Sequence, residues 1–191
     1  MPASDVNDIR QYLDKSGCPV CARLKKCQSG LLGGDAVAEA PSLCNFHAWA
    51  LAKSTPCGSA ARVFLSVLHR ADREEGPCPF CARLKEVECQ SLSALKQLLA
   101  QPKDREWMHR YGRLCQGHAM ELERLVGDED KKAIREILQR IREELDRELA
   151  SLLRNSSACD SSGGGVLGRA AEFLASQRGL GNLDGVAGRR K

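Results

Sequence analysis

The sequence predicts an all-α protein built as a tandem helical repeat, followed by a long helix and a flexible tail. The first observation is a duplicated motif: C-P-V-C-A-R-L-K begins at residue 18 and C-P-F-C-A-R-L-K begins at residue 78. The second is that L-C-x-x-H follows each copy, at 43–47 and at 114–118. The third is composition, because aromatic residues make up 4% of the chain while Leu, Ala, Glu, Arg and Lys are plentiful, which favours helices over strands.

The first repeat is predicted over residues 1–57. Apolar side chains recur at helical spacing over 5–16, and the following glycine is placed to end that helix. A second helix is expected over 22–32, opened by the second cysteine of the pair, and its glycines lead into a loop over 33–42. A short helix from about residue 42 would then carry the Cys and His of L-C-x-x-H one turn apart, on the same face.

The second repeat, over 58–127, follows the same plan with longer helices. Pro102 is expected to close its central helix, and Asp104 to cap the short helix that follows. The helices are predicted over 59–75, 82–100 and 114–126.

Residues 128–154 predict a long amphipathic helix, roughly 40 Å in length at about 1.5 Å per residue. Two i, i+4 pairs, Glu136–Arg140 and Glu143–Arg147, would support it. Its apolar stripe is expected to pack over the repeats, with a homodimer or partner seam as the alternative. Residues 155–191 are rich in Ser and Gly at their start and predict a flexible tail with a short helix near 166–178.

Two sets of three cysteines and one histidine are the chemical signal of this chain, because three thiolates and an imidazole form a standard tetrahedral zinc set. The predicted metal ligands are Cys18, Cys21, Cys44, His47, Cys78, Cys81, Cys115 and His118. We expect two structural Zn²⁺ ions per chain, with an iron–sulfur cluster as the alternative cofactor. Local closure of one site by each repeat is the simpler wiring; crossing of the pairs between repeats is the other.

Charge and apolar runs restrict the class of protein. The formal net charge is +4, and six thiolates with two zinc ions would reduce it to +2, which is too small to argue for nucleic acid. No apolar run precedes the first motif, so we expect no signal peptide, and no apolar run is long enough to span a bilayer. We therefore expect a cytoplasmic protein whose partner is another protein, without nucleic-acid or membrane binding.

The C-P-x-C tetrapeptides also suggest the hypothesis of a thiol–disulfide oxidoreductase, since such enzymes place C-x-x-C at the start of a helix, where the thiol pKa is lowered. The basic residues after each motif, Arg23, Lys25, Arg83 and Lys85, would favour the thiolate. These enzymes carry the motif beside a β-α-β pattern, however, and no convincing strand is found here. The C-x-x-H units would have no role in that mechanism, so catalysis is the disfavoured interpretation.

Other chemistry-bearing residues receive structural interpretations. Cys27 and Cys89 do not occupy equivalent repeat positions and are expected to be small core residues. Trp49 and Trp107 are expected to anchor their helices in the core. His109 has no partner that the sequence identifies.

The duplicated C-P-x-C-x-x-L and L-C-x-x-H motifs, over about residues 5–126, resemble a group of uncharacterised prokaryotic proteins of small size and helical structure that carry this double motif. The resemblance implies a helical metal-binding fold, presumes the same eight ligands, and implies no known activity. Together with the residues themselves it predicts a non-catalytic zinc-binding interaction or regulatory module, with a redox protein as the alternative.

Overall fold

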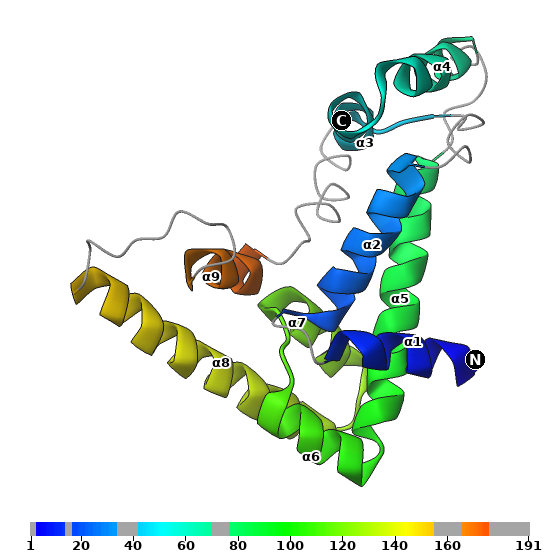
Figure 1. Cartoon of the computed structure of the whole chain (residues 1–191). Coiled ribbons are helices and arrows are strands. Elements are labelled where there is room, and N and C mark those ends of the chain that lie inside the picture. The colour runs from blue at the N-terminus through cyan, green and yellow to red at the C-terminus, as the bar shows by residue number, and fades with distance from the viewer. Residues whose placement is uncertain (1–2, 14–16, 34–41, 70–76, 155–165, 176–191) are drawn as a thin grey trace, which may run out of the picture. The chain divides into compact units, whose positions relative to one another are not determined.

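The protein is helical throughout the part that the computed structural model describes, which comprises residues 3–13, 17–33, 42–69, 77–154 and 166–175. Within these ranges there are nine α-helices and no strand (Figure 1), so the predicted all-α class is confirmed. The helices are α1 Ala3–Leu13, α2 Pro19–Gly33, α3 Asn45–Ser54, α4 Cys57–Leu68, α5 Pro79–Leu99, α6 Pro102–Tyr111, α7 Gln116–Leu125, α8 Asp128–Arg154 and α9 Val166–Ala175.

The chain divides into two compact units. Unit 1 comprises Met1–Ala22 and Gln90–Lys191, and unit 2 comprises Arg23–Cys89. Both α2 and α5 therefore begin in one unit and end in the other. These boundaries differ from the predicted division into 1–57 and 58–127, which remains a prediction about the sequence repeat.

The longest helix, α8, organises unit 1. Its bounds, Asp128–Arg154, are those predicted from the apolar stripe, and acidic residues fill its first turn, where the helix dipole favours negative charge. The helix packs against α6, α7 and α9. Its buried side chains are Ile134, Ile137, Leu138, Ile141 and Leu145. The i, i+3 and i, i+4 spacing of these residues is what brings them to one face.

Unit 2 has a smaller apolar core, and cysteines belong to it. The buried cluster consists of Leu32, Leu51, Val63, Cys78 and Phe80. Cys44 and Cys81 are partly buried and pack against the same cluster. Because a core of this size supplies little burial, its cysteines contribute a substantial part of the packing that holds unit 2 together.

Prolines begin helices here rather than end them. Pro19 and Pro79 are the first residues of α2 and α5, so each helix starts earlier than predicted, directly after the first cysteine of its motif. Pro102 likewise begins α6, with Gln101 as N-cap and Asp104 in the first turn rather than at the cap. The physical reason is that proline lacks an N–H and has a fixed φ, which suits the first helical position.

Two expectations about the core are wrong. Trp49 is 60% exposed, and Cys89 is exposed, so neither is a core residue.

Among the described helices, none combines the length and the apolar character that crossing a membrane requires. The predicted flexibility of the tail concerns residues outside the described part, apart from the helix that the structure places at Val166–Ala175.

We predict that Gly112→Ala destabilises the protein by about 1–3 kcal/mol, in the range that overpacking costs. Gly112 ends α6, and its N–H donates to the Met108 carbonyl oxygen at 2.8 Å. A Cβ at this residue would clash with that same oxygen, which is backbone and cannot rotate away.

The matched control is Gly30→Ala in α2, where an added Cβ meets no atom within 4 Å. This change should stabilise the protein by about 0.5–1 kcal/mol, since Ala is the better helix former. Chemical denaturation of both variants measures the two free energies of unfolding, and equal effects would contradict the close approach at Gly112.

Candidate metal centres

The structure gathers the eight predicted ligands into two groups of four. Site A consists of Cys18, Cys21, Cys115 and His118, and site B of Cys44, His47, Cys78 and Cys81. Within each group the sulfur and ring-nitrogen atoms all lie within 4.8 Å of one another. Site A falls entirely within unit 1 and site B within unit 2.

The wiring is crossed, and the simpler expectation of local closure is wrong. Each C-P-x-C pair meets the C-x-x-H pair of the other repeat. The physical reason is that each C-P-x-C motif begins a helix, which must lead away from its own cysteines. α2 is about 22 Å long at about 1.5 Å per residue, and its residues from Arg23 onward belong to unit 2. α5 leads back, because from Gln90 onward it belongs to unit 1.

All four half-sites share one local structure, the first turn of a helix. Cys18, Cys44, Cys78 and Cys115 each precede the first helical residue, and the carbonyl of each accepts the first intrahelical hydrogen bond. The donors are the backbone N–H groups of Ala22, Ala48, Ala82 and Ala119, at 3.0, 3.0, 3.1 and 3.0 Å. The second ligand of each pair is the third helical residue. Each site is thus formed where two helix N-termini meet.

This placement suits thiolates. A side chain at the N-cap normally accepts a hydrogen bond from the backbone N–H of the third helical residue. In α7 the Cys115 sulfur takes that role and accepts from the His118 N–H at 3.5 Å. The unpaired N–H groups of a helix start carry a partial positive charge, so two helix starts at one site favour negative sulfur atoms.

The leucine of each L-C-x-x-H motif fixes the approach to the helix. Leu114 is 2% exposed, and Leu43 packs against the apolar core of unit 2. An apolar residue just before the N-cap commonly anchors the entering chain in this way. The leucine therefore holds the cysteine that follows it in position.

Site A is closed to solvent. All four of its residues are buried, with exposed fractions of 3% or less. The His118 Nδ1 lies 3.5 Å from the Cys18 sulfur, 3.3 Å from the Cys21 sulfur and 3.0 Å from the Cys115 sulfur. The sulfur atoms of Cys21 and Cys115 are 3.7 Å apart.

Site B has the same arrangement with greater exposure. The His47 Nδ1 lies 3.1 Å from the Cys44 sulfur, 3.5 Å from the Cys78 sulfur and 3.4 Å from the Cys81 sulfur. The sulfur atoms of Cys44 and Cys81 are 3.6 Å apart. His47 and Cys78 are buried, whereas Cys44 and Cys81 are partly exposed.

These separations are close to those of a tetrahedral zinc site, with the sulfur–nitrogen distances somewhat shorter. With Zn–S near 2.3 Å and Zn–N near 2.05 Å, tetrahedral angles place two sulfur atoms about 3.8 Å apart and a sulfur and a nitrogen about 3.6 Å apart. The observed distances are 3.6–3.7 Å and 3.0–3.5 Å. They are far longer than a disulfide bond, and the described cysteines are all free. Each group could therefore hold a metal ion.

Without a cation, the thiol pKa values of two ligand cysteines are raised and that of a third is lowered. Hydrogen bonds to Cys115 and Cys18, then burial, raise the pKa of Cys21 far above its usual value. Burial, a hydrogen bond to Cys44 and the neighbouring thiolates raise the pKa of Cys81 to about 12. At Cys78 burial opposes ionisation, but hydrogen bonds from His47 and from the backbone of Cys44 and Cys81 lower the pKa to about 6. Ionising all three sulfurs of a site together requires a positive charge between them.

The imidazole of site B is held by aromatic contacts. Phe80, inside the C-P-F-C motif, stacks on His47 with ring centroids 5.1 Å apart, and Phe46 meets it edge-on at 5.2 Å. The His47 Nε2 is buried and has no hydrogen-bond partner among the described residues. Its ring therefore turns Nδ1 to the sulfurs and leaves Nε2 in apolar surroundings. The corresponding residues at site A are Val20 and Gly117.

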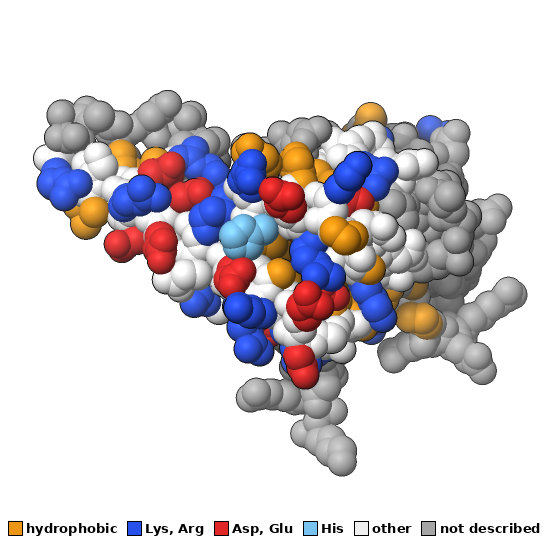
Figure 2. Space-filling model, turned by 90° about the horizontal axis from the view of Figure 1, so that it is seen from below, with side chains coloured by type: hydrophobic (Ala, Val, Ile, Leu, Met, Phe, Trp, Pro, Cys, Tyr) orange, Lys and Arg blue, Asp and Glu red, His pale blue; other side chains and the backbone are white. Residues whose placement is uncertain are grey.

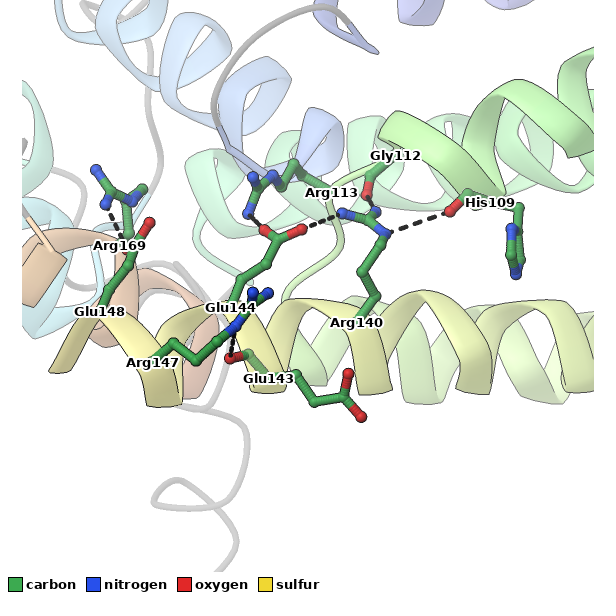
Figure 3. Close-up of polar contacts among 9 residues, drawn as sticks. All are labelled: His109, Gly112, Arg113, Arg140, Glu143, Glu144, Arg147, Glu148 and Arg169. Atoms are coloured by element: carbon green, nitrogen blue, oxygen red, sulfur yellow. Dashed lines mark hydrogen bonds and ion pairs between the residues drawn. The ribbon is translucent and has the colours of Figure 1, made fainter. Parts of the chain in front are cut away.

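α8 supplies no ligand but holds the segment that presents Cys115. Arg140 donates to the carbonyl oxygens of Gly112 and His109, at 2.5 and 3.3 Å, which satisfies acceptors at the end of α6 (Figure 3). Glu144 pairs with Arg140 at 2.9 Å and with Arg113 at 2.7 Å. Arg113 lies two residues before Cys115, so this cluster fixes the chain between α6 and α7.

The sequence did not reveal these supporting contacts. The predicted pairs of α8 differ in detail, because Arg140 pairs with Glu144, and Arg147 donates to the Glu143 backbone oxygen. His109 gains a partner in Glu136 at 3.1 Å. Of the aromatic contacts, a phenylalanine between the two cysteines was the one available signal.

We predict that Arg140→Met, which keeps the length but removes all donors, destabilises the protein by about 1–2 kcal/mol. Hydrogen bonds from charged groups contribute about this much, and the loss leaves Glu144 with one partner fewer. The control is Arg147→Met on the same helix, where the Nε contact is to the backbone oxygen of Glu143 one turn earlier, and little change is expected. Thermal unfolding of the two variants tests this; equal losses would show that Arg140 has no special role.

Comparison with known protein families, with curated proteins and with solved structures found no match. The chain is therefore a small helical protein with two buried Cys₃His groups, and no family is identified. The resemblance to the prokaryotic group with the double motif stays a prediction.

Proposed function

We propose that the protein is a non-catalytic zinc-binding module with two structural Cys₃His sites, acting through interaction with another protein. The observation that carries this is the gathering of all eight ligand atoms into two groups of four, with the atoms of each group within 4.8 Å of one another. Four protein ligands leave no open position for a substrate or an activated water, which distinguishes structural from catalytic zinc.

The redox alternative is less well supported by the geometry. A dithiol enzyme needs one accessible attacking sulfur beside its partner in the same C-x-x-C pair. At site A all four ligands are buried. At site B the two partly exposed cysteines, Cys44 and Cys81, belong to different motifs. The histidine and the third cysteine of each site have no role in that mechanism. A cluster cofactor would use the same soft ligands, so metal identity is decided by analysis rather than by ligand type.

A protein partner fits the surface better than a nucleic acid does. Figure 2 shows one face on which Lys and Arg side chains are interleaved with Asp and Glu. Ion pairs account for several of these charges, as in Arg105 with Glu129 and Asp130. Nucleic-acid surfaces instead gather positive charge on one side.

A homodimer through α8 remains the alternative for the partner. The stripe from Ile134 to Leu145 is buried within the chain. A seam between two copies would therefore use the end of the helix, where Leu153 is 83% exposed.

Metal analysis tests the proposal directly. We expect about two zinc per chain and no visible absorption in aerobically or anaerobically purified protein. Cys78→Ser should release about one zinc and lower the melting temperature, because ligand formation and folding are coupled. Cys57→Ser is the control, since Cys57 is exposed and lies outside both groups. A brown protein containing iron, or unchanged metal content in Cys78→Ser, would contradict the proposal.

Zinc affinity should fall as the pH is lowered from about 8 to about 5. Cys81, with its pKa raised to about 12, keeps its proton at neutral pH in the metal-free protein, so zinc must displace it. The Cys78 thiol has a pKa of about 6, so it binds a proton that competes with zinc only below that pH. Zinc affinity falls with falling pH because protons and zinc compete for the same sulfur atoms. Competition with a chromophoric chelator measures the affinity, and a flat profile would exclude thiolate ligation.

A further inference from the structure

The two sites differ in how well their sulfurs are protected. At site A the three cysteines are buried, with exposures of 3% at Cys18, 0% at Cys21 and 1% at Cys115. At site B only Cys78 is buried, at 8%, while Cys44 and Cys81 are partly exposed. Oxidation of cysteine depends on thiolate character and on access. If both sites hold zinc, every ligand sulfur is a thiolate, so access decides which site reacts.

The sulfur atoms of these two partly exposed residues are also neighbours. Cys44 comes from the start of α3 and Cys81 from the first turn of α5, and their sulfur atoms lie 3.6 Å apart. A disulfide needs about 2.05 Å, so a shift of roughly 1.5 Å would join them. Both residues pack against the apolar cluster of unit 2, to which Cys78 belongs.

We propose that site B is a peroxide-sensitive zinc site, in which oxidation joins Cys44 to Cys81 and releases the metal while site A keeps its own. This rests on the proposed function, since it requires both sites to hold zinc. The inference adds a form of redox regulation, in which the folding of unit 2 depends on whether Cys44 and Cys81 are reduced or oxidised. The oxidant is hydrogen peroxide.

The chemistry balances in two displacements. One of the two thiolates attacks a peroxide oxygen, the O–O bond breaks, and hydroxide leaves as a sulfenic acid forms. The other thiolate then attacks the sulfenic sulfur, the S–O bond breaks, and a second hydroxide leaves as the disulfide forms. The two sulfurs lose two electrons to the peroxide, and two protons from solvent convert both hydroxides to water. Zn²⁺ is left with Cys78 and His47 and dissociates.

The structural consequence differs between the units. In unit 2 the ligands are part of the apolar cluster, so their rearrangement disturbs the core itself. Unit 1 has apolar side chains that are fully buried without being ligands: Leu95, Leu98, Leu99, Met108, Leu122, Ile134 and Ile137. Metal loss confined to site B should therefore loosen residues of Arg23–Cys89 and leave α6, α7 and α8 folded.

The test uses the full-length zinc-loaded protein carrying Cys57→Ser and Cys89→Ser, which removes the two cysteines outside the sites that are exposed in the described part of the chain. Hydrogen peroxide is added in steps and released zinc is followed with a colorimetric chelator. We expect roughly one zinc per chain to be released first, with a Cys44–Cys81 disulfide found by peptide mass mapping. Hydrogen exchange should accelerate within Arg23–Cys89 and not within α8, and reductant with zinc should reverse both changes.

Three outcomes would overturn the inference: simultaneous release of both metals, first release from site A with a disulfide among its cysteines, or no release before irreversible oxidation. Zinc content measured before peroxide is added separates this from the proposed function. Two zinc per chain at the start, followed by any of these three outcomes, contradicts the inference alone. A protein that never contained zinc contradicts both.

Discussion

The structure depends on the convergence of helix N-termini. Each ligand pair occupies the residue before a helix and the third residue within it, so its direction is set by the backbone of the first turn. Two such turns facing each other bring four donors together with little freedom of side-chain rotation. The same turns supply partial positive charge and N–H donors to the sulfurs. The local backbone thus does most of the positioning that a metal site requires.

The remaining architecture can be understood as support for these turns. α8 contributes no ligand, yet its Arg140 and Glu144 hold the segment just before Cys115. In unit 2 the support is the apolar cluster, and Phe80 both belongs to that cluster and stacks on His47. Site A is therefore supported by contacts from the long helix α8, and site B by the apolar cluster of unit 2.

Much of this could be predicted from sequence, because the ligand motifs and the helix over 128–154 each carry a strong periodic or chemical signal. The pairing of the motifs could not, since either C-P-x-C is chemically equivalent as a partner for either C-x-x-H. Only the path of α2 and α5 decides between them. The wrong prediction for Trp49 was avoidable: it lies two residues after His47, which turns it to the opposite side of α3, while Leu51, four residues after, is buried.

Crossed pairing also changes the topology of chain closure. Local pairing would have made two separate rings in series, whereas the observed pairing places the ring closed by Cys44 and Cys81 inside the ring closed by Cys21 and Cys115. The sequence separations are 37 and 94 residues, so closing the inner ring costs about 0.8 kcal/mol less in loop entropy. Once it has closed, less free chain remains for the outer ring to immobilise. If each group holds a metal ion, nesting therefore favours cooperative assembly of the two centres in a preferred order, with the inner one first.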